Sequence, residues 1–139
     1  MLLVMALQDP SDKTPDRSRT YDLVERTAKF GEEAIRFARK IPRDPVSLPL
    51  ISQFVRSATS IGANCAEADD AFSQREFRHR IGISRKEARE TKHWLRMIVA
   101  AAPELADPAR ALWQEAKELH LICATILRKK KQDSPPDSN

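Results

Sequence analysis

The chain has 139 residues, which is enough for one domain with a single core and too few for two. Only three residues are glycine and 6% are aromatic, while alanine, leucine, arginine, lysine and glutamate are abundant, so the composition favours an all-α protein. The formal net charge of +4 permits an acidic partner without requiring one.

The two ends of the chain are predicted to be tails. Residues 1–7 are apolar, but this stretch is too short to span a bilayer or to form an ordinary signal sequence, so we expect no membrane segment. Residues 8–19 are polar and interrupted by proline, and residues 132–139 are similar in character. We therefore expect disordered tails at 1–19 and 132–139 and a folded unit over residues 20–131.

The first two predicted helices lie before residue 69. The first begins near Asp22, which forms a capping-box-like start with Glu25, and ends before Pro42. The second spans about residues 50–68. The expected apolar stripe of the first helix consists of Val24, Ala28, Gly31, Ile35, Ala38 and Ile41, widened by Phe30, Ala34 and Phe37.

The last two predicted helices have clearer beginnings. Ser73 and Glu76 form a capping box that opens the third helix, which runs to Ala102 and stops at Pro103. Asp107 is the expected N-cap of the fourth helix, with proline at its first position, and this helix extends to Lys131. Four amphipathic helices with short connections predict an antiparallel four-helix bundle.

The second helix has an apolar side and a polar side. Its apolar side is formed by Leu50, Phe54, Ala58, Ile61 and Cys65. A polar row at steps of four, four and three lies roughly opposite and consists of Arg56, Ser60, Asn64 and Glu67. These side chains could pair along the helix, meet another helix or subunit, or simply face solvent.

The third helix carries a basic row on one face. The stretch between Ser73 and Ala102 contains eight basic and three acidic residues. The basic row consists of Arg78, Arg85, Arg89, Lys92 and Arg96. Such a row can follow a phosphate backbone, although it lacks the interleaved aromatic residues that base stacking would need. A solvated face and an interface with an acidic protein surface remain alternatives.

The acidic residues of the third helix indicate a second possible role for its charges, namely contact with another copy of the chain. Glu87 and Glu90 lie about half a turn from the basic row, beside Trp94, which is of an exposed type. A helix that is basic on one side and acidic on the other is complementary to a second copy placed head-to-tail, and a repeated contact of this kind closes a ring. Trp94 is the expected hydrophobic anchor of that contact.

Catalytic and metal sites are not expected. Glu76 with His79 and Glu90 with His93 each match a di-iron element, but both pairs lie on one helix, about 21 Å apart, and cannot share a metal pair. No triad-like arrangement or glycine-rich phosphate loop is present. We therefore predict a protein that is not an enzyme and has no metal, cofactor or catalytic residue.

The two cysteines are predicted to be core residues. Cys65 and Cys123 lack metal-type spacing, and each stands among apolar residues at helical period. Unpaired thiols of this kind fit a reducing cytoplasm.

Two segments resemble those of a known family. The first reads Arg56-Ser-Ala-Thr-Ser-Ile-Gly-Ala-Asn64, and the second reads Ser84-Arg-Lys-Glu-Ala-Arg-Glu-Thr-Lys-His-Trp-Leu95. They are similar to the bacterial four-helix bundle proteins called 23S rRNA-intervening-sequence proteins, over about residues 20–130. The family's pattern residues fall on Arg56, Ser60, Ile61, Asn64, Glu67, Glu87 and Glu90. Gly62 and Ala68 depart from the commoner pattern, as they do in one subgroup.

The resemblance implies an up-down-up-down bundle that assembles as a homopentamer, with no enzymatic activity. The accessory variability determinant of diversity-generating retroelements is a similar basic pentamer that contacts nucleic acid. The leading hypothesis is therefore an oligomeric protein that binds RNA, DNA or a ribonucleoprotein through the basic face of its third helix. The alternative is a self-assembling scaffold that binds a protein partner.

Overall fold

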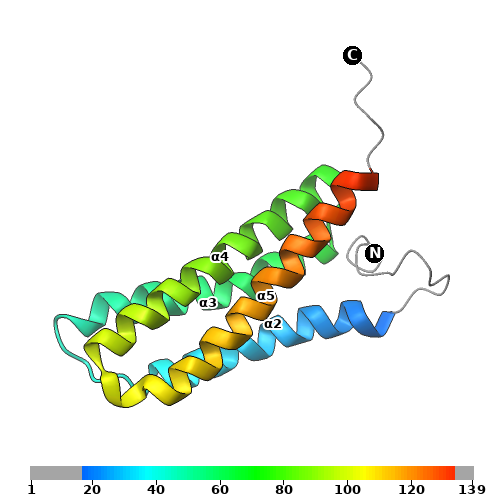
Figure 1. Ribbon diagram of the computed structural model, residues 1–139. Helices are drawn as coiled ribbons and strands as arrows, with labels where there is room; N and C mark the ends of the chain where they lie inside the picture. Colours follow the sequence, from blue (N-terminus) through cyan, green and yellow to red (C-terminus); the bar gives the residue numbers. More distant parts are fainter. Residues whose placement is uncertain (1–16, 134–139) are drawn as a thin grey trace.

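The computed structural model describes residues 17–133, which form four α-helices and one short 3-10 helix and contain no strand (Figure 1). The prediction of an all-α protein with four helices is therefore confirmed. Residues 1–16 and 134–139, which make up most of the two predicted tails, lie outside the described residues. The elements in chain order are α2 (Arg17–Ala38), α3 (Ser47–Asp69), α4 (Gln74–Ala101), η1 (Pro103–Leu105) and α5 (Ala106–Asp133).

The α2 helix begins and ends earlier than predicted. It spans residues from Arg17 onward, and no glycine or proline interrupts residues 17–30. It ends at Ala38 rather than Ile41, because the backbone tightens into i→i−3 hydrogen bonds such as Ile41 N to Ala38 O at 3.2 Å. Ile41 still belongs to the core.

The α3 helix begins three residues before the predicted start. The Asp44 carboxylate accepts hydrogen bonds from the backbone N–H groups of Val46 and Ser47, at 2.9 and 2.8 Å. Pro49 then falls in the first helical turn, where a missing N–H costs no hydrogen bond. Pro49, which lies just before the predicted start, is thus part of the helix.

The capping prediction is confirmed for α4 and wrong for α5. Ser73 Oγ accepts from Glu76 N at 3.1 Å, and Glu76 reaches back to the backbone N–H of Phe72. Asp107 is not an N-cap, because η1 runs directly into α5 and the helix already begins at Ala106. The α5 helix also continues to Asp133, two residues beyond the predicted end.

Each helix packs mainly on its neighbours in the chain. Contacts are most extensive between α3 and α4, followed by α4 with α5 and α2 with α3, whereas α2 and α5 touch far less. The α2–α3 and α4–α5 connections lie together at one end of the molecule, and the α3–α4 turn lies at the other (Figure 1). The α3 and α4 helices are thus central, and α2 and α5 are each held largely by one neighbour.

The core is a continuous cluster of aliphatic and aromatic side chains. Its largest fully buried members are Phe30, Phe54, Phe77, Ile61, Ile81, Leu95, Ile98, Leu119 and Ile126. The predicted apolar side of α3 is buried except at Leu50, which is half-buried. On α2, the buried face is rotated from the predicted stripe, so Thr27 is inside while Ile35 is 41% exposed.

Small side chains let the helices approach closely. At Gly62 of α3, an added Cβ would lie 3.1 Å from the carbonyl oxygen of Thr27 in α2.

Between α3 and α4, the Thr91 hydroxyl donates to Ser57 Oγ at 3.0 Å, and the Ser84 hydroxyl donates to Ile61 O at 2.9 Å. Buried hydroxyl groups at this contact therefore have partners.

Both cysteines lie in the core, as predicted. Cys65 of α3 and Cys123 of α5 are fully buried free thiols. Cys65 Sγ and Ser84 Oγ share a hydrogen bond at 3.4 Å. The hydrogen bond with Cys65 raises the pKa of the Cys123 thiol, and burial raises it further.

Within residues 17–133, no helix combines the length and the hydropathy that crossing a bilayer requires.

Candidate nucleic-acid interface

The five residues of the predicted basic row do not share one environment. Two of them contact α5. The Arg78 guanidinium donates to the backbone carbonyl of Leu127 at 2.9 Å, near the C-terminal end of that helix. The Lys92 ammonium lies 5.3 Å from the centroid of the Trp113 ring, which is a cation–π distance. Arg78 therefore helps to join α4 to α5.

The other three residues of the row point to solvent. Arg85, Arg89 and Arg96 are exposed, and among residues 23–129, whose side chains the structure describes, no carboxylate forms an ion pair with them. The backbone carbonyl of Arg85 lies 3.2 Å from His120 Nδ1 of α5. These three arginines therefore form an unpaired group of positive charges on α4, whose Arg75 and Lys86 are also exposed.

The α5 helix contributes residues that the sequence reasoning did not include. Trp113 is half-buried, and both Lys92 and Lys117 lie within 6 Å of its ring centroid. The basic row of α4 has no interleaved aromatic residue of its own, but the Trp113 indole of α5 lies within the basic surface. We call this surface the basic seam, and it consists of Arg85, Arg89, Lys92 and Arg96 of α4 with Arg110, Trp113 and Lys117 of α5.

A small cavity opens in the basic seam next to Trp113. Its volume is about 270 Å³, and its apolar walls include Leu95, Val99 and Ala109 together with the Trp113 ring. Arg96 and Arg110 also line it. The Arg110 guanidinium also donates a hydrogen bond to the Asp107 carboxylate at 3.1 Å, and both side chains of this ion pair are exposed. The cavity thus combines an apolar, aromatic wall with cationic groups.

Three of the family-pattern residues, Arg56, Glu87 and Glu90, form a separate cluster between α3 and α4. Arg56 donates to Glu87 Oε1 at 3.2 Å and to Glu90 Oε1 at 2.7 Å, and the Trp94 indole N–H donates to the same Glu90 oxygen at 3.1 Å. Hydrogen bonds to Glu90 and Glu87 raise the pKa of Arg56. Burial raises the pKa of Glu90, but hydrogen bonds from Arg56 and Trp94 outweigh it and leave this pKa below its ordinary value.

The polar row of α3 is therefore used mainly within the chain. Ser60 Oγ donates to the backbone carbonyl of Arg56 at 2.6 Å, and Asn64 Nδ2 donates to Ser60 O at 2.9 Å. Asn64 Oδ1 accepts from Arg80 at 3.3 Å. The polar row could pair along the helix, meet another helix or subunit, or face solvent. Arg56 and Asn64 meet another helix, α4, whereas Glu67 is exposed.

This cluster bears on the prediction that the acidic side of α4 contacts a second copy of the chain. Glu87 and Glu90 already bind Arg56, so they are not free carboxylates awaiting a neighbouring subunit. Trp94 is half-buried rather than exposed, and its indole is bonded to Glu90, while its role as the anchor of a subunit contact stays a prediction. Sequence reasoning missed the Arg56 pairing because the partners lie 31 and 34 residues away along the chain.

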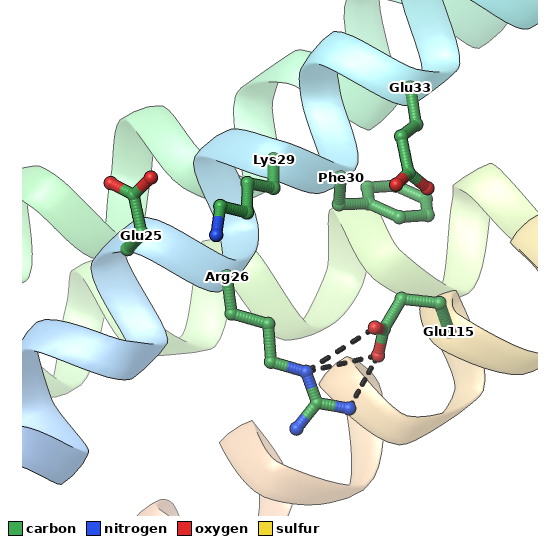
Figure 2. A pocket seen from close by; sticks show the side chains of 6 residues that line it. All are labelled: Glu25, Arg26, Lys29, Phe30, Glu33 and Glu115. Atoms are coloured by element: carbon green, nitrogen blue, oxygen red, sulfur yellow. Dashed lines mark hydrogen bonds and ion pairs between the residues drawn. The ribbon is translucent and has the colours of Figure 1, made fainter.

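A larger cavity lies on the opposite side of α5, where α2 and α5 make few contacts. Its volume is about 390 Å³, and Figure 2 shows Arg26 reaching from α2 to Glu115 of α5 beside it. Arg26 Nε donates to Glu115 Oε1 at 3.1 Å, and this bond raises the pKa of Arg26. Glu25, Lys29 and Glu33 also line the cavity, so its charge is mixed rather than basic.

The two Glu-x-x-His elements do not form a site. Among the described residues, no group of three or more histidine, cysteine, aspartate or glutamate side chains is arranged to hold a metal ion. Glu90 is engaged by Arg56 and Trp94, while His79 and His93 are exposed. The expectations of no metal, no cofactor and no catalysis remain predictions.

Comparison with known proteins gives a family and a fold. Residues 19–123 match the sequence model of the 23S rRNA-intervening sequence protein family. A crystal structure of a protein with unknown function from the S23 ribosomal protein family of Bacteroides thetaiotaomicron VPI-5482 is similar, with a TM-score of 0.72 and 23% identity. The match covers 79% of this chain and 98% of that one, and at this identity it shows the fold alone. No curated protein matches the sequence.

Proposed function

The chain belongs to the 23S rRNA-intervening sequence protein family, and from this membership we propose that it is a non-catalytic, cytoplasmic accessory protein that binds nucleic acid through the basic seam. The observation that carries the proposal is the group of three exposed arginines, Arg85, Arg89 and Arg96, which have no carboxylate partner among the side chains described for residues 23–129. Resemblance to the accessory variability determinant of retroelements supports a ribonucleoprotein setting.

The spacing of these arginines suits a phosphate backbone. Arg85 and Arg96 are separated by about 17 Å along the helix axis, which is long enough to meet several successive phosphates. Guanidinium groups bind phosphate oxygens in a bidentate geometry, and each contact releases condensed counterions. Lys92 of the same row and Lys117 of α5 add positive charge beside these arginines.

Fluorescence anisotropy tests the proposal directly. Labelled RNA hairpins and DNA duplexes would be titrated with the purified chain at several salt concentrations. We expect the logarithm of the affinity to fall linearly with the logarithm of salt. Reversing all three charges, in the Arg85→Glu, Arg89→Glu and Arg96→Glu triple variant, should weaken binding by about tenfold or more, because attraction becomes repulsion.

A matched control separates the seam from net charge. Arg39, Lys40 and Arg43 are also exposed, but they follow the end of α2 rather than lying on α4. Their reversal to glutamate changes the net charge equally and should leave most of the affinity intact. Absence of binding at low salt, or equal losses in the two triple variants, would contradict the proposed function.

We also infer that the helices follow an up-down-up-down course and that the chain assembles as a homopentameric ring. The loops at alternate ends support the course, and the family resemblance supports the ring (Figure 1). Exposed apolar side chains are available for such contacts, namely Ile35, Val46, Leu48, Phe72 and Leu121.

Light scattering tests the ring. It should give a particle of five 15.8-kDa chains, and a monomer would contradict the assembly. If Arg89→Glu changes the particle mass and not the affinity for nucleic acid, the row is a subunit contact and the scaffold function replaces the proposed one.

A further inference from the structure

The basic seam contains an aromatic ring in addition to its cations. We propose that it binds an unpaired base of a single-stranded nucleic acid, which stacks on Trp113 while neighbouring phosphates contact the surrounding cations. This inference rests on the proposed function and narrows it from nucleic acid in general to single strands. Base stacking on aromatic side chains flanked by positive charge is a general mode of single-strand binding.

The contacts between α4 and α5 determine where the indole lies. Arg78 meets Leu127, Arg85 meets His120, and Lys92 meets Trp113. Each step of seven residues forward along α4 corresponds to seven residues back along α5. Trp113 is therefore placed in the middle of the seam, opposite the basic row.

The cavity beside Trp113 has the size and lining of a base site. At about 270 Å³ it is slightly smaller than pockets that hold drug-sized ligands, which measure about 300–1,000 Å³. Leu95, Val99 and Ala109 give it apolar walls suited to a planar ring. A base paired within a duplex already stacks on its neighbours, so only an unpaired base can enter.

The cations around this cavity complement the phosphates of a strand. Lys92 and Lys117 lie over the Trp113 ring, 5.3 and 5.8 Å from its centroid, so a base that stacks there takes the place of an ammonium group, which can then contact a phosphate. Arg96 and Arg110 line the cavity. Asp107 is the carboxylate bonded to one of these cations, and its side chain is 90% exposed. The side of α5 that faces α2 has mixed charge by comparison, with Glu115 and Glu33 at its cavity.

The test compares three probes with one set of variants. The probes are labelled oligo(dT), the same oligonucleotide with abasic sites in place of alternate bases, and a DNA duplex of equal length. The variants of the full chain are Trp113→Ala, Trp113→Phe and the control Trp94→Phe, which alters the tryptophan outside the seam. Circular dichroism melting would verify that each variant folds.

The expected result is a loss specific to stacking. Trp113→Ala should lower the affinity for oligo(dT) about tenfold and leave duplex binding unchanged, whereas Trp113→Phe keeps an aromatic face and should retain most of the affinity. The wild-type chain should bind the abasic probe more weakly than oligo(dT). In the Trp94→Phe background, Trp113 fluorescence should be quenched by oligo(dT).

The remaining outcomes distinguish the two proposals. Binding of all three probes that is equal and indifferent to Trp113 would overturn the stacking inference and leave the proposed function standing. If no probe binds, both fail. Displacement of oligo(dT) by free thymidine monophosphate at comparable concentration would assign the site to a free nucleotide and would also overturn binding of a strand. If Trp113→Ala fails to fold, Trp113→Phe and the abasic probe still decide the matter.

Discussion

At the scale of single residues, Arg56 joins α3 to α4 through two carboxylates that differ in exposure. The Glu87 side chain is 15% exposed and that of Glu90 is 38% exposed. Exposed ion pairs contribute little, but removing Arg56 would leave Glu87 half-buried without its cation.

We therefore expect Arg56→Ala to lower the free energy of unfolding by roughly 1–2 kcal/mol, as measured by urea denaturation. Arg36→Ala is the matched control, since the Arg36–Glu32 pair is exposed on both sides. It should change stability by less than about 0.5 kcal/mol. Equal losses in the two variants would show that Arg56 acts as an ordinary surface residue.

The same cluster makes stability depend on pH. Because hydrogen bonds from Arg56 and Trp94 outweigh burial, the pKa of Glu90 lies below its ordinary value of 4.5 in the folded chain. The folded state thus binds this proton more weakly than the unfolded state does. The stabilisation should be complete above the ordinary value and should disappear as the pH falls through the lowered one.

Urea midpoints measured between neutral pH and about pH 3 test this dependence. The difference in urea midpoint between the wild-type chain and Glu90→Gln should shrink as the solution becomes more acidic. Protonation of Glu90 eliminates the same negative charge that the substitution eliminates. A difference that stays constant over this range would exclude the titration of Glu90 as its source.

At the scale of elements, the close approach of α2 and α3 depends on Gly62. An alanine in a helix interior is more favourable than glycine by about 0.5–1 kcal/mol. At Gly82 of α4, an added Cβ meets nothing within 4 Å, so Gly82→Ala should gain this amount. At Gly62 the Cβ would meet the backbone of Thr27, so the same substitution should gain nothing or destabilise the fold.

Thermal unfolding of the two glycine variants, followed by circular dichroism, gives a direct comparison. The intrinsic helix preference is the same in both, so the difference between them isolates the helix–helix contact. Two equal increases in melting temperature would mean that α2 moves away from α3 without cost.

The start of a helix was predictable from the sequence where the residues that determine it lie close together in the chain. The capping box of Ser73 and Glu76 spans four residues, and it fixed the start of α4 correctly. The start of α3 depends on Asp44, and the helix includes Pro49, which lies outside the predicted range. Asp107 resembled an N-cap, but the 3-10 turn before it supplies a different entry into α5.

The candidate site was predictable only in part, for a related reason. Helical periodicity identified the basic row, because all five residues belong to one helix. It could not show that Arg56 binds Glu87 and Glu90, or that Trp113 faces Lys92, because these pairs come from different helices. Such contacts depend on the register between helices, which no spacing within a single helix determines.

At the scale of the whole molecule, the packing is uneven. The α3 and α4 helices each contact two neighbours extensively, whereas α2 and α5 rely largely on one because they barely meet each other. Elements with fewer contacts open more easily than the rest of a fold.

Native-state hydrogen exchange should therefore give the highest protection in α3 and α4. Amides of α2 and α5 should exchange through smaller openings that cost less free energy than global unfolding. Uniform protection over all four helices would indicate that the bundle opens only as one unit.

The buried thiols of Cys65 and Cys123 give the chain an internal reporter of those openings. Each sulfur is shielded from solvent, and the pKa of Cys123 is raised, so an alkylating reagent should not react while the helices remain packed. One thiol belongs to a central helix and the other to an outer helix. Because the two thiols are hydrogen-bonded to each other, detachment of α5 from α3 should expose both of them. The rate of their alkylation would therefore measure how often α5 detaches, without any label being added to the protein.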